Sequence, residues 1–370
     1  MSKIIIIGGF GPSLIRFRGE LIKSWQDSGY AVVAAAPGEE IKKDLNKMGI
    51  RYHSIRLKRS SINPFADLVL FVSLIGLLFK EKPDYLFLYT VKPVIYGSLA
   101  AFFFKKIRVF SLITGLGYVF SSDRAGKSLL KSFIIKLYKL ALSGNEKVFF
   151  QNHDNSRALL DLQVVKPKQI VHVNGSGVNL DYYYQAPLPE NTATFLLIGR
   201  LLKEKGFMEY YEAARALKGK YPQAVFMLVA WALDDDPSSI NGEVLANWKS
   251  EGIVEVYGET KDVRPVISAA GIYVLPSYYG EGVPRTILEA MSMGRPIITT
   301  DTPGCRETVV EGVNGFLVPA KDSAALAGAM ERFIDEPELV EYMGHESRKI
   351  AEKRFDVHKV NRVINGEMGL

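Results

Sequence analysis

The chain is 370 residues long, more than one hydrophobic core usually supports, so we expect two domains. Hydrophobic residues make up 48% and charged residues 23%, a balance typical of folded proteins and unlike that of disordered ones. A single cysteine, Cys305, excludes a disulfide framework, and because no histidine lies near it we expect it to pack rather than to act as a nucleophile. The apolar run 68–79 contains no charged residue but is too short to span a bilayer, so we expect either a buried helix or one that inserts partly into an interface.

Charge is divided unevenly along the chain. Residues 1–170 contain 26 Lys and Arg against 12 Asp and Glu, whereas the remaining residues contain 20 against 28. A basic first half indicates contact with an anionic surface or substrate. We do not expect nucleic acid to be that partner, because no helix-turn-helix, zinc or aromatic RNA-binding motif accompanies the charge.

The first half alternates between apolar strands and helical segments. Residues 3–7 form a continuous apolar run that ends at Gly8–Gly9, the pattern of a strand buried in a parallel sheet. A helix is expected next, with Ser13 as a candidate cap; Arg16 and Arg18 lie in its first turns, where positive charge is unfavourable unless an anion is bound nearby. Further strands are predicted at 31–35, 52–57, 85–89, 108–113 and 148–151. This alternation predicts a doubly wound α/β domain.

Two loops follow predicted strands of this half, and ligands collect at the carboxyl ends of parallel strands. Lys92, after strand 85–89, is either placed to hold a phosphate group or a surface lysine. Gly115 and Gly117, after strand 108–113, would allow a ligand to approach the backbone closely, although turn glycines are also common without function.

Residues 127–143 predict a basic amphipathic helix. Its expected apolar face contains Leu130, Phe133, Ile134, Leu137 and Leu140 or Ala141, and four lysines flank that face. Such a helix can lie on an anionic membrane, or it can cover the sheet and expose a solvated basic face.

Glycines and prolines break the periodicity within 173–189, where we expect the hinge. The first domain then spans 1–175 and the second 190–350, with 351–370 as a C-terminal segment. Strands of the second domain are predicted at 194–198, 224–230, 253–257, 272–276 and 296–300, and late helices at 322–335 and 338–354.

Arg200 and Lys205, in the sequence GRLLKEKG, follow the first of these strands, and two cations at a strand end would neutralise a phosphate well.

The stretch 276–307 organises the second domain. A strand leads into a glycine-containing turn, and we expect a helix from about Gly282, with Glu281 at its start and Glu289 eight residues further on. With a rise of about 1.5 Å per residue, the two carboxylates would lie roughly 12 Å apart along the axis, about the span from the sugar to the ribose of a nucleotide sugar. The backbone N–H groups of Gly282 and Val283 would hold the diphosphate.

Residues 281–296, together with 199–206, resemble the motifs of the retaining glycosyltransferases of family 4, which have the GT-B fold of two Rossmann-like domains. The resemblance implies that Glu281 orients the sugar of a UDP-sugar donor and that Glu289 binds its ribose. Arg200 and Lys205 would stabilise the departing diphosphate. Further donor contacts are expected at Gly199, Gly282, Val283, Pro284 and Arg285, and acceptor contacts at Arg16, Arg18, Lys92, Gly115 and Gly117.

Four segments of the first half, SLIRFRGELI, RSSINPF, TVKP and ITGLG, are similar to a branch of this family that builds bacterial capsule, O-antigen and other surface glycans. That similarity implies a sugar linked to polyprenyl diphosphate as acceptor, retention of configuration and no requirement for a metal. It also implies that a final helix crosses back onto the first domain. With no signal peptide evident, we expect a cytoplasmic protein attached peripherally to the inner, anionic face of the cytoplasmic membrane.

The chain departs from the family in two places. Relatives often have Arg where this chain has Gly280, for which Arg285 could compensate, and several have a His near the loop of Lys92, where this chain has none. The base that activates the acceptor is therefore unassigned.

Other functions remain open from the sequence. A UDP-sugar 2-epimerase shares the fold, a soluble acceptor would need no membrane, and a non-catalytic scaffold would not need the four charged residues. Asp234–Asp236 contains the metal–nucleotide motif of the other major glycosyltransferase fold, but its setting favours an acidic loop. The five histidines show no metal-ligand spacing.

Overall fold

The structure is a computed structural model that describes residues 1–57, 63–116, 128–231 and 238–370, without the side chains of 128–130. The chain divides into two compact units. Unit 1 contains Met1–Gly177 and Val357–Leu370, and unit 2 contains Val178–Asp356. The chain therefore passes between the units twice, and its first passage lies within the segment expected to contain the hinge.

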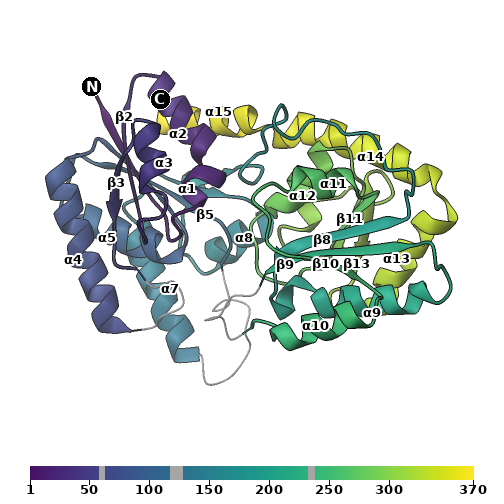
Figure 1. Ribbon diagram of the computed structural model, residues 1–370. Helices are drawn as coiled ribbons and strands as arrows, with labels where there is room; N and C mark the ends of the chain where they lie inside the picture. The colour runs from purple at the N-terminus through teal and green to yellow at the C-terminus, as the bar shows by residue number, and fades with distance from the viewer. Residues whose placement is uncertain (58–62, 117–127, 232–237) are drawn as a thin grey trace. The chain divides into compact units, whose positions relative to one another are not determined.

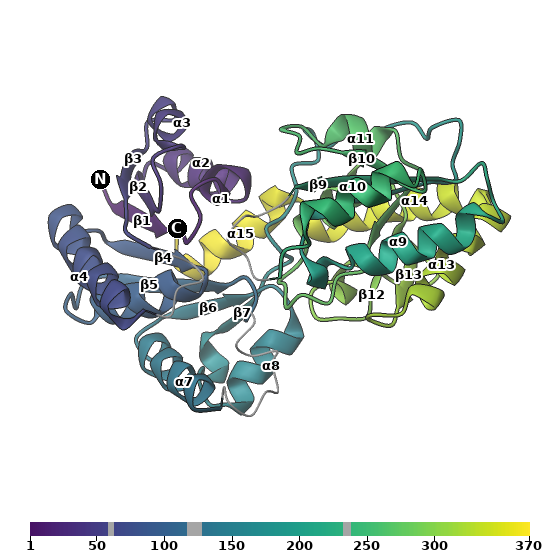
Figure 2. The same ribbon diagram turned by 60° about the horizontal axis from the view of Figure 1, so that its bottom comes forward.

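Unit 1 is built on a seven-stranded parallel sheet with the order β3-β2-β1-β4-β5-β6-β7 (Figures 1 and 2). The strands are β1 Lys3–Ile7, β2 Ala31–Ala36, β3 Arg51–Ser54, β4 Tyr85–Tyr89, β5 Arg108–Ile113, β6 Lys147–Phe150 and β7 Ile170–His172. Six of them lie where apolar runs predicted them. The three residues of β7 were not predicted, because so short a segment shows no periodicity.

Helices cover both faces of this sheet, which is why Ile4–Ile7 are all fully buried (Figures 1 and 2). One face is covered by α4 Pro64–Glu81, α5 Ser98–Ala101, α7 Ser128–Leu142 and α8 His153–Asp161. The other is covered by α1 Ser13–Arg16, α2 Gly19–Asp27, α3 Lys42–Lys47 and α15 Val357–Met368. Helix α15 belongs to unit 1 through packing: Ile364 is buried in the same cluster as Trp25, whose Nε1 donates to Asn365 Oδ1 at 2.9 Å.

Two helices of unit 1 differ from prediction. The helix after β1 is broken: α1 ends at Arg16 and α2 begins at Gly19. Ser13 is not its cap, because Pro12 occupies that position and the Ser13 hydroxyl lies 2.8 Å from the Tyr89 hydroxyl.

In α7, two of the residues predicted on the apolar inner face point outward. Phe133 and Leu140 are 59% and 56% exposed; Ala141, the predicted alternative to Leu140, is buried, and so is Tyr138, which was not predicted. The predicted member Leu130 lies outside the described side chains. The inner face of α7 is therefore rotated relative to the one that the sequence pattern suggested.

Unit 2 has a six-stranded parallel sheet with the order β10-β9-β8-β11-β12-β13. Its strands are β8 Thr194–Arg200, β9 Val225–Trp231, β10 Glu255–Tyr257, β11 Ile272–Leu275, β12 Ile297–Thr300 and β13 Gly315–Val318. Its helices are α9 Phe207–Lys218, α10 Gly242–Ser250, α11 Arg264–Ser268, α12 Arg285–Ser292, α13 Ser323–Asp335 and α14 Glu338–Ile350. Strand β13 was not predicted; the other five were.

In each sheet the strand order reverses once, between β1 and β4 in unit 1 and between β8 and β11 in unit 2. Connections leave such a point toward opposite faces, so the carboxyl ends of the two strands flank the crevice in which open α/β sheets bind ligands. Of the predicted site residues in unit 2, Arg200 and Lys205 lie at or after the end of β8, and Glu281 and Glu289 come after β11. Among the described residues, no helix is long and apolar enough to cross a membrane.

Candidate active site

The first part of the site is the loop after β8. The strand ends at Arg200, and a short 3-10 turn, Lys203–Lys205, leads into α9. The turn closes at Gly206, whose φ is 79° and where a Cβ would lie 2.3 Å from the carbonyl oxygen of Pro276. Only glycine allows this approach, and it brings Lys205 to the loop that follows β11.

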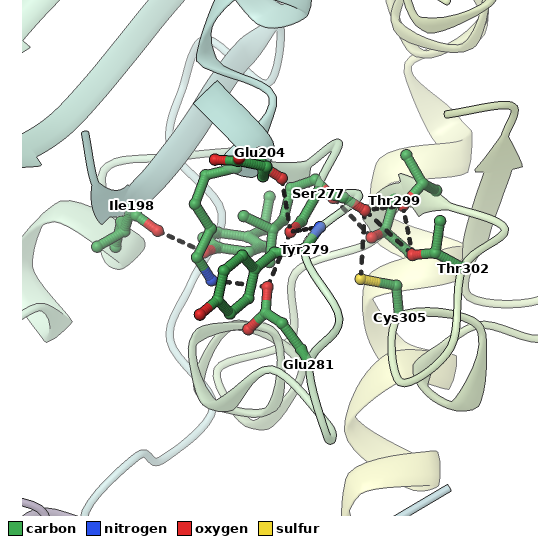
Figure 3. A network of polar contacts seen from close by, with 12 residues as sticks. Ile198, Glu204, Ser277, Tyr279, Glu281, Thr299, Thr302 and Cys305 are labelled. Carbon is green, nitrogen blue, oxygen red and sulfur yellow. Dashed lines mark hydrogen bonds and ion pairs between the residues drawn. The ribbon is translucent and has the colours of Figure 1, made fainter. Parts of the chain in front are cut away.

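The loop after β11 supplies the partner of Lys205. Lys205 Nζ lies 2.7 Å from Glu281 Oε1, and the two side chains are only 12% and 15% exposed. The buried Ser277 hydroxyl lies 2.8 Å from the same carboxylate oxygen, and Tyr278 N donates to Glu204 O at 2.8 Å (Figure 3). The structure thus brings Lys205 and Glu281 together as a hydrogen-bonded ion pair at the point where the strand order reverses.

A second loop supports this arrangement from behind. The hydroxyls of Thr300 and Thr302 both donate to the carbonyl of Ser277 (Figure 3). Gly304 has a φ of 85°, and a Cβ there would lie 1.5 Å from the carbonyl oxygen of Gly282. Cys305 is fully buried, and burial raises the pKa of its thiol, so it packs as expected and is poorly suited to act as a nucleophile.

The prediction that a helix begins at about Gly282 is wrong. Helix α12 begins at Arg285, because Pro284 has an extended backbone, with φ −64° and ψ 120°, and occupies the N-cap position. Glu281 therefore lies in a turn before the helix, and the estimate of 12 Å along a helical axis loses its basis. Gly282 packs its carbonyl against Gly304, and the Val283 side chain is buried; the helix-terminal N–H groups begin at Arg285.

The second carboxylate, Glu289, is held by two donors. Arg285 Nε lies 3.0 Å and the Tyr183 hydroxyl 2.9 Å from the same oxygen, Oε1, and the residue is 7% exposed. Burial raises the pKa of Tyr183, with Glu289 adding to the effect, so the hydroxyl keeps its proton and donates. The backbone of Tyr183 is fixed in turn, because its carbonyl accepts from Ser292 Oγ at 2.7 Å and from Arg348 at 3.1 Å.

Tyr183 was not predicted as a site residue. It lies 106 residues before Glu289, in the segment expected to contain the hinge, and no spacing connects the two. Ser277 was also missed as a partner of Glu281, although it precedes the predicted turn directly in the sequence.

Arg200 has no ion pair or hydrogen bond to its side chain among the residues that the structure describes, and its residue is partly exposed at the end of β8. At the neighbouring Gly199, a Cβ would meet only the ring of Phe207, at an ordinary contact distance of 3.7 Å. Packing within the protein therefore leaves room for a side chain at position 199.

The predicted residues of unit 1 lie in different environments. Arg16 is exposed, whereas Arg18 is 3% exposed and its guanidinium carbon lies 5.5 Å from the centre of the Tyr89 ring. Lys92 pairs with Asp67 of α4 at 2.5 Å, and Asp67 also accepts from the Tyr96 hydroxyl. The charge of Lys92 is therefore already compensated within unit 1.

The glycines of the loop after β5 can be compared with prediction only in part. Gly115 has a φ of 134°, which suits glycine, whereas Gly117 lies outside the described residues. Asp234–Asp236 also lie outside them. In the part of the chain that the structure describes, no group of three or more His, Cys, Asp or Glu is arranged to hold a metal ion.

Two parallel-sheet α/β units with this topology have the GT-B fold. The structure of HepE from Anabaena in complex with UDP has the same fold, with a TM-score of 0.80 at 18% identity over 100% of both chains. Residues 184–350 match the family described as glycosyl transferases group 1, and residues 14–152 match the glycosyl transferase 4-like family. The chain belongs to the glycosyltransferases that combine these two domains.

Named relatives are similar along most of the chain. An N,N'-diacetylbacillosaminyl-diphospho-undecaprenol α-1,3-N-acetylgalactosaminyltransferase of Campylobacter jejuni is 29% identical over 89% of this chain and 88% of its own. A UDP-Gal:α-D-GlcNAc-diphosphoundecaprenol α-1,3-galactosyltransferase of Escherichia coli is 26% identical over 75% of this chain and 73% of its own.

Proposed function

We propose that this glycosyltransferase moves a sugar from a UDP-sugar to a saccharide linked to polyprenyl diphosphate, with retention of configuration, in the assembly of a surface polysaccharide or glycoprotein glycan. The observation that carries the donor half of the proposal is the Lys205–Glu281 pair at the reversal point of unit 2. The acceptor half is supported by the two relatives named for undecaprenyl-diphosphate-linked substrates.

Donor binding follows from the charges of unit 2. Arg200 has no partner among the described residues and is available to an anion, whereas Lys205 is held by Glu281 and would be shared with the donor diphosphate. Two fixed cations disperse the charge that builds up on a leaving diphosphate, which lowers the barrier to its departure. Because these cations do the work that a bound metal does in other transferases, we propose that no metal is needed.

The two carboxylates have separate roles in this proposal. Glu281 lies in the turn before α12 and would orient hydroxyls of the donor sugar. Glu289 is held through Oε1 by Arg285 and Tyr183 and would accept from the ribose hydroxyls. A carboxylate with a fixed position binds a diol at a smaller entropic cost than a mobile one.

The acceptor is assigned to unit 1. Arg18 and the Lys92 loop follow β1 and β4, the two strands between which the order of that sheet reverses. The basic balance of residues 1–170 fits a substrate that carries a diphosphate and is anchored at an anionic, cytoplasmic membrane face.

Removal of the cations tests the donor site. Arg200→Ala and Lys205→Ala should each lower turnover about 100-fold or more, because each loses charge stabilisation of the leaving group. Lys203→Ala is the matched control, since Lys203 is exposed in the same 3-10 turn and should leave turnover nearly unchanged. The assay is a panel of UDP-sugars with short polyprenyl-diphosphate sugars, with and without EDTA.

Three outcomes would contradict the proposal. Near-normal turnover of Arg200→Ala and Lys205→Ala would contradict the assignment of these residues to the donor diphosphate. Inhibition by EDTA would contradict a mechanism without a metal. Conversion of the UDP-sugar without any acceptor would favour the epimerase.

A further inference from the structure

Helix α4 has two apolar faces. One is buried against the sheet and contains Leu70, Leu74, Leu77 and Leu78. The other is exposed, although it is also apolar: Phe65 is 80%, Val72 59% and Phe79 68% exposed, and Leu68 and Val69 belong to the same stripe. A helix of a globular protein normally has polar residues on its solvent-facing side, so the second face needs a partner.

The exposed face of α4 continues onto neighbouring elements. The ring of Phe103, itself 68% exposed, packs beside that of Phe71 of α4, with centroids 6.3 Å apart. Phe102 contacts Gly144 just after α7, where a Cβ would lie 2.5 Å from its ring. Helix α5, which leads into Phe102, contacts both α4 and α7 and lies between them in Figure 1.

Positive charge surrounds these apolar residues. Six lysines lie on the same three segments, and none forms an ion pair with another described residue: Lys80, Lys105, Lys106, Lys131, Lys136 and Lys139. The two acidic residues of α4 are not available to offset them, since Asp67 is paired with Lys92 and Glu81 is buried among three basic side chains.

We infer that the exposed face of α4, with Phe102, Phe103 and the lysines of α7 and of residues 105–106, docks unit 1 on an anionic lipid bilayer. The apolar stripe would lie at the boundary between head groups and acyl chains, and the lysines would contact anionic head groups. The charge decides the choice of partner, because a second copy of this chain would bring the same uncompensated lysines against each other. The inference deepens the proposed function and rests on it for a lipid-borne acceptor.

Sedimentation of the full chain with vesicles tests the surface. Vesicles of phosphatidylcholine and phosphatidylglycerol (7:3) should bind the protein, and pure phosphatidylcholine should bind it more weakly. Val69→Ser/Val72→Ser should weaken binding about tenfold, because two valines lose their apolar contact with the lipid. Val310→Ser/Val363→Ser is the matched control, with two valines that are each 45% exposed elsewhere, and should bind like the unmodified protein.

A second variant tests the contribution of the lysines to vesicle binding. Lys105→Ala/Lys106→Ala should weaken binding to the anionic vesicles about fivefold per lysine, and should leave binding to pure phosphatidylcholine unchanged. Circular dichroism melting curves establish that each variant is folded.

The inference is overturned if Val69→Ser/Val72→Ser binds vesicles as tightly as Val310→Ser/Val363→Ser. It is also overturned if the α4 variant converts an oligomer to a monomer in sedimentation velocity without a change in vesicle binding, which would make this face a subunit contact. Transfer to a short-chain, water-soluble acceptor separates the two proposals: full transfer without vesicle binding contradicts only the docking surface, whereas no transfer to any polyprenyl-diphosphate sugar contradicts the function.

Discussion

Two carboxylates of unit 2 are each held by one partner nearby in the sequence and one far away. Tyr183 and Arg285 both donate to Oε1 of Glu289, and Lys205 and Ser277 both approach Oε1 of Glu281. Oε1 of each carboxylate is therefore held by two donors of the protein. Such engagement fixes the rotamer of the carboxylate before a ligand arrives, which is how a binding site becomes preorganised.

Tyr183→Phe tests this preorganisation. The variant keeps the ring and removes one hydrogen bond to a carboxylate, so affinity for UDP should fall about fivefold. The preference for UDP over 2′-deoxy-UDP should shrink as well, since a less ordered Glu289 distinguishes the ribose hydroxyls poorly. Isothermal titration calorimetry measures both, with Tyr184→Phe as the control because Tyr184 is 59% exposed. An unchanged preference in Tyr183→Phe would show that the tyrosine does not position Glu289.

The charged residues proposed for this site could be selected from the sequence because they lie in short local motifs. Arg200, Lys205, Glu281 and Glu289 each follow or precede a recognisable strand. Their partners were not identifiable in the same way. Tyr183 reaches Glu289 only through the fold, and the compensation of Lys92 by Asp67 depends on where α4 packs.

At the scale of elements, apolar runs predicted the strands well and their ends less well. A buried parallel strand such as β1 is a continuous apolar run bounded by glycines, a pattern that amphipathic helices and loops rarely produce. Strands β7 and β13, with three and four residues, are too short to stand out. The start of α12 was misplaced because Pro284 and the turn before it favour an extended backbone that the pattern of apolar residues does not record.

The loop before α12 packs against Gly304, which lies in the loop after β12. Gly304→Ala should lower the free energy of unfolding by at least about 2 kcal/mol more than Gly312→Ala does. Both glycines have positive φ, 85° and 72°, but only at Gly304 would the new methyl group clash with backbone. Urea unfolding measures the difference. Affinity for UDP should fall in the same variant, because the displaced carbonyl belongs to the turn that contains Glu281.

Glu81, at the end of α4, joins that helix to two strands. Its carboxylate contacts Lys3 of β1 and Arg51 and His53 of β3. Burial alone would raise the pKa of Glu81, but hydrogen bonds from these side chains outweigh it and lower the pKa to about 2. A lowered pKa in the folded state means that the stabilisation is present at neutral pH and is lost as the pH falls from about 4.5 to about 2.

Glu81→Gln should therefore lower the free energy of unfolding at pH 7 by about 2 kcal/mol, and the variant should lose less further stability between pH 4.5 and 2.5 than the unmodified protein. Glu146→Gln is the control, since that carboxylate pairs with Arg108 at the surface. Urea unfolding at several pH values measures both. Parallel curves for Glu81→Gln and the unmodified protein would contradict the assignment.

At the scale of the whole molecule, length and charge predicted two domains with a basic first half, and the passage of the chain between two units follows that division. For 68–79 the sequence left open a buried helix or partial insertion into an interface. Which side of α4 is exposed could not be predicted, because its sequence is apolar on every side and only packing shows which side the sheet leaves uncovered.

Removal of residues 357–370 should destabilise unit 1 selectively. Val360, Ile364 and Met368 of α15 are buried in the cluster that contains Trp25. Without them the Trp25 ring meets water, so tryptophan fluorescence should shift to longer wavelength, and a Trp25→Phe version of the truncated chain should lack that shift. An unshifted spectrum in the truncated chain would contradict the packing of α15 described above.

The position of α15 in the sequence also determines the order in which the units can be completed during synthesis. Unit 2 is one continuous segment and has all its residues once Asp356 has left the ribosome, whereas unit 1 still lacks the helix that covers Trp25. Domains usually fold as they emerge, the amino-terminal one first. In this protein the half that is translated first is finished last, and until then the apolar face that α15 later covers stays exposed.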